Sequence, residues 1–303
     1  MKTGTPGLDR RPRAWIIGGG KLRLRIPLMR LLEEQGFEMT AVGPEKTDVF
    51  AEAGFAYHRY PLRRTLNPLA DLRAGKVLEE LFNQYRPDLV HSVNTKPALL
   101  VPAAARRSGV PACVRTITGL GALFSSSSPL SLSLRLLYRR LQRKARRDCD
   151  FTVFQNPDDR HYFRQHRMTS ASSDTVILGS GIDVEALRAR RRAPGTLTDL
   201  RGQLNARGPI VMMVARLIRP KGIGDFLEAA TAVRRVKPET TFLLVGPEVT
   251  EGPSVFPLER VQRCLEIADD SEPHIETPDI IKYNAAEGWK FNAETDQACI
   301  EWV

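Results

Sequence analysis

Short apolar runs alternate with longer amphipathic segments along most of this chain. A run such as Ala14–Gly18 is short, almost uniformly apolar and ends in glycines, which is typical of a strand buried on both faces. Segments such as Leu69–Tyr85 repeat their apolar residues at helical spacing. Strands that alternate with helices predict a parallel, doubly wound α/β sheet. The expected strands are Ala14–Gly18, Glu38–Val42, Asp88–His91, Ala112–Thr118, Phe151–Phe154, Thr175–Leu178 and Ile210–Val214, and the expected helices are Ile26–Gln35, Leu69–Tyr85, Pro97–Ser108 and Pro129–Arg147.

The most informative segment starts at the apolar run Ile210–Val214, which predicts a buried strand. A basic turn follows, with Arg216 and Lys221 on either side of Pro220, and an amphipathic helix opens after it. A parallel strand that ends in cations beside a helix N-terminus is where α/β proteins hold anionic phosphates. The spacing alone fits equally well a strand, loop and helix whose cations are simply solvated.

Several sequence blocks resemble the retaining glycosyltransferases of family 4. Ala215-Arg216-Leu217 and Lys221-Gly222 resemble the signature that opens the second domain of these proteins. Four more blocks occur in the family's order. The first two resemble first-domain blocks of a subgroup that builds lipid-linked polysaccharides, the third resembles the linker between the domains, and the fourth resembles the next strand of the second domain. The four blocks are Thr116–Gly121, Phe154–Asp159, Gly179–Asp183 and Phe242–Gly246.

The resemblance implies the GT-B fold, in which two doubly wound, Rossmann-like α/β domains face each other. The acceptor-side domain would span residues 14–182, and the nucleotide-sugar domain would span residues 183–303. The implied reaction moves a hexosyl or N-acetylhexosaminyl group from a nucleotide sugar, UDP-sugar first, to a glycan or polyprenyl-linked acceptor with retained configuration. The family usually needs no metal, so no cofactor is expected.

Candidate site residues follow from the resemblance and from their positions after strands. In the family, the residues matching Arg216 and Lys221 bind the donor diphosphate, and they would stabilise its charge as it leaves, which makes them the catalytic candidates. Glycines after the first strand let the backbone approach a ligand, and their N–H groups can form an anion-binding nest, although a tight turn explains them equally well. The donor side would include Gly19, Gly20 and Gly246, and the acceptor side would include Asn94, Lys96, Thr118, Gly119 and Gly121.

The resemblance weakens after about residue 250. Glu251 and Glu259 match the spacing of the family's E-x7-E motif, but the two prolines between them make a poor helix entry. The segment Ile300–Val303 resembles a strand that precedes the family's base pocket, so the second domain is expected to be incomplete. A missing C-terminal part, a remnant gene and a tail that replaces the missing layer remain open. A catalytically inactive fragment that acts as a membrane-associated binding protein is therefore the alternative function.

Composition and charge limit the number of domains, the cellular compartment and the kind of partner to be expected. The 303 residues are enough for two domains, and four scattered cysteines without a CxxC pair fit a reducing cytoplasm. No run of eighteen apolar residues predicts a spanning helix, and residues 1–13 lack the apolar core of an export signal. Residues 251–303 hold 12 acidic and 4 basic side chains, whereas residues 1–250 hold 23 acidic and 41 basic side chains. A basic body suits an anionic partner.

The segment 129–147 is the clearest candidate for contact with that partner. Its leucines 130, 134, 137 and 141 form one stripe, and seven arginine and lysine side chains occupy the other positions. This pattern predicts peripheral binding to the inner face of the cytoplasmic membrane, with the basic face on the lipid headgroups. A domain helix that buries the leucine stripe and exposes a solvated basic face is equally compatible. Nucleic acid is not expected as a partner, because aromatic residues are only 7% and no recognition motif is present.

Overall fold

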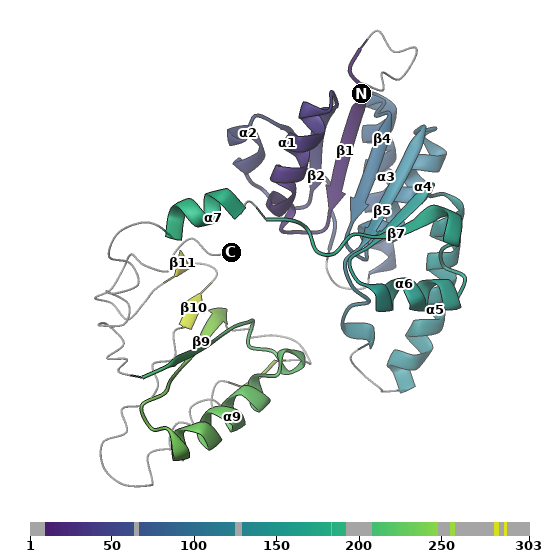
Figure 1. The fold of residues 1–303 in the computed structure, drawn as a ribbon. Coiled ribbons are helices and arrows are strands. Elements are labelled where there is room, and N and C mark those ends of the chain that lie inside the picture. The colour runs from purple at the N-terminus through teal and green to yellow at the C-terminus, as the bar shows by residue number, and fades with distance from the viewer. Residues whose placement is uncertain are drawn as a thin grey trace. The chain divides into compact units, whose positions relative to one another are not determined.

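A computed structural model describes residues 10–63, 67–124, 129–182, 184–191, 208–247, 255–257, 282–284 and 288–289. The chain divides into two compact units, Met1–Asp183 (unit 1) and Val184–Val303 (unit 2) (Figure 1). The sequence placed the domain boundary between residues 182 and 183, one residue earlier. The predicted incompleteness of the second domain concerns residues that lie mostly outside the described ones.

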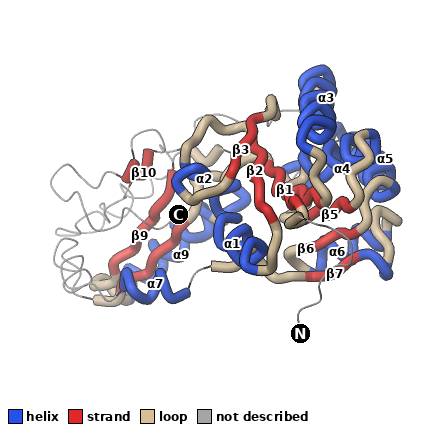
Figure 2. Tube along the Cα trace, turned by 90° about the horizontal axis from the view of Figure 1, so that it is seen from above, coloured by secondary structure: helices blue, strands red, loops and turns tan. Residues whose placement is uncertain are grey.

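Unit 1 is built on a seven-stranded sheet whose strands all run parallel. The strand order is β3-β2-β1-β4-β5-β6-β7, and Figure 2 shows β3, β2 and β1 side by side from above. Every predicted strand of this unit is present, with ends shifted by two residues at most. The strands are β1 Arg13–Gly18, β2 Glu38–Gly43, β3 Ala56–Arg59, β4 Leu89–Val93, β5 Ala112–Ile117, β6 Phe151–Phe154 and β7 Asp174–Val176.

Helices cover both faces of this sheet, which confirms the doubly wound prediction (Figure 1). The sequence did not predict the short elements α2 and β3, because four residues are too few to show a period. The helices of unit 1 are η1 Leu22–Arg25, α1 Ile26–Glu34, α2 Val49–Glu52, α3 Pro68–Tyr85, α4 Pro97–Arg107, η2 Ala122–Phe124, α5 Pro129–Arg147, α6 Pro157–Gln165 and η3 Ala171–Ser173.

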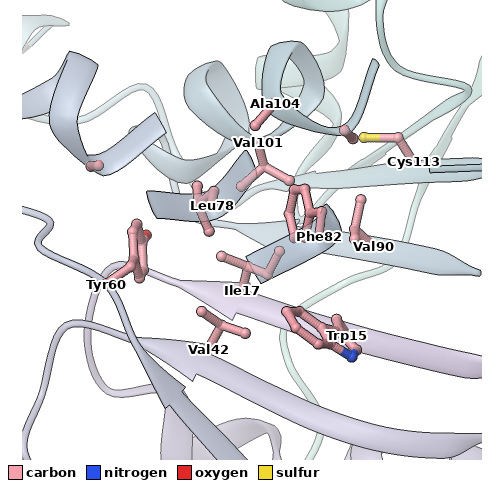
Figure 3. Packing of buried hydrophobic residues seen from close by; sticks show 12 residues of the cluster. Trp15, Ile17, Val42, Tyr60, Leu78, Phe82, Val90, Val101, Ala104 and Cys113 are labelled. Carbon is pink, nitrogen blue, oxygen red and sulfur yellow. The ribbon is translucent and has the colours of Figure 1, made fainter. Parts of the chain in front are cut away.

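Alternation along β1 explains why the sheet needs helices on both faces. Trp15 and Ile17 join a buried cluster with α3 and α4, whereas Ala14 and Ile16 join a second cluster with α1. Phe82 of α3 is fully buried in the first cluster, beside the strand residues drawn in Figure 3. Because successive strand side chains point to opposite faces, a strand that is apolar throughout must be covered twice.

Helix α5 buries a different face from the one the leucine pattern favoured. Its buried residues are Tyr138, Gln142 and Ala145, whereas Leu137 and Leu141 of the predicted stripe are exposed. The interpretation of the leucines as one core-facing stripe is therefore wrong for these two positions. The side chains that the helix shares with the sheet are polar as well as apolar, and leucine spacing does not reveal them.

The buried guanidinium of Arg115 on β5 explains the position of Gln142. Arg115 is fully buried and donates hydrogen bonds to Gln142 Oε1 (2.8 Å), the Met168 carbonyl oxygen (2.8 Å) and Thr152 Oγ1 (3.0 Å). Burial lowers the pKa of Arg115. A buried cation needs such partners, so α5 must present an amide above β5 rather than a leucine.

In unit 2, a parallel pair of strands carries the basic turn. Strand β8 (Ile210–Val214) pairs with β9 (Thr241–Pro247), and the described sheet has the order β11-β10-β9-β8. Helix α9 (Ile223–Val236) packs Ile223 and Leu227 against Leu244 of β9. The remaining described elements are α7 Val184–Arg191, η4 Arg219–Lys221, β10 Lys282–Asn284 and β11 Gly288–Trp289.

Strand β8 has the predicted bounds, but it is not buried. Met212 and Val214 are 59% and 57% exposed, and Val211 is also exposed. The prediction of a buried strand is wrong because β8 is an end strand of the described sheet, and Met213 is the one described β8 residue that packs against the buried cluster with α9.

Candidate functional site

The sheet of unit 1 reverses its strand order between β1 and β4. In open α/β sheets, ligands bind outside the carboxyl ends of the strands at such a switch point. Three loops begin there or beside it: Gly18–Gly20 after β1, Asn94–Lys96 after β4, and Thr118–Gly121 after β5. The topology therefore brings the glycine loop and most of the predicted acceptor-side residues to one edge of the sheet.

Hydrogen bonds join these loops through Asn94. Its side-chain oxygen accepts from the Gly19 N–H at 3.5 Å, and its side-chain nitrogen donates to Thr118 Oγ1 at 3.4 Å. The neighbouring Thr95 hydroxyl donates to the Gly119 carbonyl oxygen at 3.2 Å. Asn94 has a φ of 79°, a left-handed conformation that costs free energy for a residue other than glycine. Backbone strain at the centre of a hydrogen-bonded cluster is typical of functional sites.

The glycine loop is tightly packed rather than open. Gly20 has a φ of 150°, which favours glycine, and a Cβ on Gly19 would lie 3.2 Å from Leu62 Cδ2. The N–H of Lys21 donates to the Glu45 carboxylate at 3.2 Å. Two of the loop's N–H groups, those of Gly19 and Lys21, thus have acceptors within the protein. A phosphate bound to this loop would have to displace the Glu45 carboxylate.

Lys96 has a different role from the other predicted acceptor-side residues. Its ammonium group forms an ion pair with Asp71 Oδ1 (2.6 Å) and donates to the Arg63 carbonyl oxygen (2.8 Å). The Lys96 and Asp71 side chains are only 18% and 19% exposed. Lys96 therefore links the start of α4 to α3 through Asp71, and its hydrogen bond to Arg63 also fixes the segment that precedes α3. No sequence pattern predicts this contact, since Asp71 is an ordinary acidic residue in the first turn of a predicted helix.

His91 lies in the middle of β4 and is half-buried. Burial, aided by the positive charge of Arg25, lowers its pKa to about 4. Its Nε2 lies 2.7 Å from Thr116 Oγ1. The imidazole is therefore neutral at pH 7 and hydrogen-bonded within the sheet, as expected of a structural group.

The basic turn of unit 2 leaves its predicted donor-binding cations unpaired. Arg216 follows β8, and Lys221 ends η4 directly before Gly222, which starts α9 with a φ of 74°. Both side chains are exposed. Among the residues that the structure describes, neither side chain has a hydrogen-bond or ion-pair partner. Two unpaired cations at a helix N-terminus are suited to an anion.

Gly246 on β9 supports this turn from behind. A Cβ at Gly246 would collide with the Ala215 carbonyl group, so only glycine allows the backbone before Arg216 to lie this close to β9. Glu251 and Glu259, the predicted E-x7-E pair, lie outside the described residues. Gly121 has a φ of 77° in the loop after β5, where no side chain would clash within 4 Å.

A comparison with protein families shows which family the chain belongs to. The family of the glycosyl transferase 4-like domain matches residues 27–181, which is more than half of the chain. The chain belongs to this glycosyltransferase family. The matched range contains β2 to β7 and the loops after β4 and β5, and so includes Asn94 and Thr118.

Two curated relatives carry more specific names. The chain is 25% identical over 232 residues to the UDP-Gal:α-D-GlcNAc-diphosphoundecaprenol α-1,3-galactosyltransferase of Escherichia coli. It is 24% identical over 246 residues to the N,N'-diacetylbacillosaminyl-diphospho-undecaprenol α-1,3-N-acetylgalactosaminyltransferase of Campylobacter jejuni subsp. jejuni. The matches cover 75% and 80% of this chain but only 58% and 64% of the relatives, so the chain spans less than two thirds of their length.

A solved relative confirms the fold of this family member. Anabaena HepE, crystallised with UDP and glucose, is similar with a TM-score of 0.64 and 12% identity, over 90% of this chain and 70% of that one. The fold is therefore that of the GT-B glycosyltransferases. In the described part of the chain, no helix is long and apolar enough to cross a membrane, and no three His, Cys, Asp or Glu side chains are grouped as for a metal ion. The expectation that no metal is needed stays a prediction.

Proposed function

We propose that this chain transfers a sugar from a UDP-sugar to a polyprenyl-diphosphate-linked glycan in the synthesis of a cell-surface polysaccharide. The observation that carries the proposal is the pair of unpaired cations, Arg216 and Lys221, at the β8–α9 turn of a glycosyltransferase family member. Both curated relatives are named for transfer to diphospho-undecaprenol-linked sugars, which supports the acceptor class. A hexosyl or N-acetylhexosaminyl donor is the corresponding donor class.

In this mechanism, unit 2 holds the donor diphosphate and unit 1 holds the acceptor. Arg216 and Lys221 stabilise the negative charge that develops on the diphosphate as the bond to the sugar breaks. Asn94 and Thr118 offer an amide and a hydroxyl to the acceptor sugar at the edge of the sheet. Transfer occurs with retention, and the donor's own phosphate accepts the proton of the attacking hydroxyl, so no protein base is required. His91 is unsuited to that role because its Nε2 is hydrogen-bonded to Thr116 and its pKa is about 4.

Calorimetric titration with UDP tests the donor site directly. The wild-type chain should bind UDP, and the Arg216→Ala/Lys221→Ala variant should bind more weakly by at least a factor of about 100, because each of the two charged hydrogen bonds contributes about 1.5–3 kcal/mol. Arg235→Ala/Lys237→Ala is a matched control that removes the same two residue types from the other end of α9. Equal loss in both variants would reject the site.

Turnover separates an active enzyme from a binding protein. UDP-galactose and UDP-N-acetylgalactosamine should each be tested with a polyprenyl diphosphate N-acetylglucosamine acceptor, and the anomeric configuration of the product should be determined by NMR. UDP binding without turnover of any donor would favour the alternative, an inactive glycosyltransferase fragment that binds its ligands.

We also propose that α5 places the protein on the inner face of the cytoplasmic membrane. The cations of this helix divide into two rows. The guanidinium groups of the first row form hydrogen bonds within unit 1. Arg135 donates to the carbonyl oxygens of Leu123 and Phe124, Arg139 to the Tyr162 hydroxyl, and Arg143 and Arg146 to the carbonyl oxygens of His166 and Arg167.

The second row faces outward together with leucines. Arg140, Lys144 and Arg147 are exposed and have no side-chain partner among the described residues. Leucines 132, 136, 137 and 141 are between 44% and 58% exposed. Leucines beside cations on one helix face suit a bilayer interface, where the apolar side chains enter the headgroup region and each cation contributes about 1 kcal/mol near anionic lipid. Leucines as well as cations would thus contact lipid, whereas the sequence analysis assigned this contact to the basic face alone.

Vesicle sedimentation tests this surface. The protein should bind vesicles of phosphatidylglycerol and phosphatidylethanolamine, and should bind pure phosphatidylcholine much more weakly. Arg140→Gln/Lys144→Gln and Leu136→Ser/Leu137→Ser should each reduce binding at least tenfold. Arg73→Gln/Lys76→Gln on the exposed face of α3 removes equal charge and should have little effect. Binding that ignores lipid charge, or that the control variant weakens equally, would exclude α5 as the membrane surface.

A further inference from the structure

A hollow of about 400 Å³ lies at the carboxyl end of β3, next to the glycine loop. Its lining residues are Pro44, Arg59, Tyr60, Pro61, Leu62 and Arg63. The volume is within the range of small-ligand sites and is enough for a diphosphate with part of an attached sugar. All of the lining belongs to unit 1, and the family motifs described above assign none of these residues a role.

The backbone around the hollow is held in place by hydrogen bonds. The Tyr60 N–H donates to the Gly43 carbonyl oxygen at 3.1 Å, and the buried Tyr60 hydroxyl donates to the Gly18 carbonyl oxygen at 3.1 Å. Lys96 donates to the carbonyl oxygen of Arg63 at 2.8 Å. The lining is thus tied to β2, to the glycine loop and to α4. A site fixed in this way loses little freedom when a ligand binds.

The charge of the hollow is positive and uncompensated. Arg59 and Arg63 are exposed, and neither guanidinium has a hydrogen-bond or ion-pair partner among the described residues. By contrast, Arg107 and Arg164 of the same unit pair with the carboxylates of Glu79 and Asp174. The planar guanidinium group binds phosphate oxygens with two parallel hydrogen bonds, and two such groups at one hollow match a diphosphate.

We infer that the Arg59/Arg63 hollow binds a sugar-linked diphosphate, and that this diphosphate belongs to the lipid-linked acceptor. The inference rests on the proposed function, which requires unit 1 to hold an acceptor that carries a diphosphate. Leu62, which lines the hollow, also packs against Gly19, the residue whose N–H donates to Asn94. A diphosphate in the hollow would therefore lie beside the glycine loop. That loop is hydrogen-bonded to Asn94, and Asn94 to Thr118, where the acceptor sugar is proposed to bind.

The donor also carries a diphosphate, so the test must distinguish the two sources. The full chain is titrated with a short-chain polyprenyl diphosphate N-acetylglucosamine, with inorganic diphosphate and with UDP. Arg59→Gln/Arg63→Gln should weaken binding of the acceptor analogue and of inorganic diphosphate at least tenfold and leave UDP binding unchanged. Arg73→Gln/Arg106→Gln, which removes two exposed arginines from α3 and α4, should change none of the three.

Each result then decides the inference. Weaker UDP binding with unchanged acceptor binding would assign the hollow to the donor and overturn the proposal. Equal effects in the two double variants, or no binding of the acceptor analogue by the wild type, would overturn it as well. If the glutamine variant does not fold, as judged by circular dichroism, Arg59→Lys/Arg63→Lys keeps the charge and should still weaken acceptor binding severalfold. Acceptor binding is an equilibrium measurement, so failure of the UDP titration or of turnover would count against the proposed function alone.

Discussion

The charged side chains of the two units are used in different ways. In unit 1, the helix joints contain paired charges: Lys96 of α4 with Asp71 of α3, and Arg160 and Arg164 of α6 with Asp174 of β7. In unit 2, the β8–α9 turn presents exposed cations that no described residue neutralises. Paired and buried charges belong to the fold, whereas unpaired and exposed charges remain available to a ligand. Mutations should therefore separate the two groups, with stability lost in the first and affinity lost in the second.

The largest effect on stability is expected at Asp174. Its carboxylate is fully buried and accepts hydrogen bonds from Arg164 and Arg160 at 2.7–2.9 Å. Asp174→Asn should lower the free energy of unfolding at pH 7 by about 3 kcal/mol, a value at the low end for buried pairs because both arginines are partly exposed. Urea denaturation measures the change, and Glu80→Gln on the exposed surface of α3 is the control.

The same variant has a defined pH dependence. Burial raises the pKa of Asp174, but the hydrogen bonds from Arg164 and Arg160 outweigh this and hold the pKa below its usual range. Because the folded-state pKa lies below the unfolded-state value of about 3.9, the stabilisation is complete above that pH and is lost as the pH falls toward the folded-state pKa. The difference between wild type and Asp174→Asn should thus be constant from pH 7 to about pH 5 and shrink below pH 4. A constant difference down to pH 3 would contradict this account.

A smaller loss is expected at Lys96. Lys96→Met keeps the apolar stem and removes the ion pair with Asp71, and should lower the free energy of unfolding by about 2 kcal/mol because the pair is largely buried. Lys76→Met on the exposed face of α3 should have almost no effect. If Lys96 instead contacted the acceptor, as the sequence predicted, its loss would weaken acceptor binding without affecting the denaturation midpoint.

The smallest effect on stability is expected at the turn that matters most for the proposed function. Arg216→Ala/Lys221→Ala should change the free energy of unfolding by less than about 0.5 kcal/mol, since exposed and unpaired side chains contribute little. Thermal and urea denaturation without UDP would measure this. A large loss of stability would mean that Arg216 and Lys221 stabilise the fold, like the paired charges of unit 1. The turn would then no longer support the proposed donor site.

The fold was predictable wherever a pattern was long enough to repeat. Strands such as Phe151–Phe154 and helices such as Leu69–Tyr85 end within two residues of their predicted positions, because apolar runs and glycines mark their limits. The four-residue elements α2 and β3 have no such period. The exposure of β8 also depends on which strands and helices pair with it in three dimensions, and the apolar run Ile210–Val214 does not contain that information.

The proximity of some candidate residues was predictable, but their individual contacts were not. The placement of Asn94 and Thr118 after neighbouring strands predicted their proximity, and their side chains are hydrogen-bonded. The pairing of Lys96 with Asp71 joins two helices whose contact follows only from packing, so the sequence pattern does not distinguish Lys96 from its neighbours. Arg59 and Arg63 were overlooked because they are two of many arginines, and only the hollow beside them distinguishes them.

The buried Arg115 determines how α5 can respond to a surface outside the protein. A rotation of the helix by one residue would take Gln142 away from the guanidinium and leave a dehydrated charge without its partner. Contacts inside the protein therefore fix the orientation of α5, whether or not a bilayer is present. Leucines 132, 136, 137 and 141 are presented by a rigid support, so the helical content of the protein should be the same in water and on vesicles, unlike that of peptides that fold only at the interface.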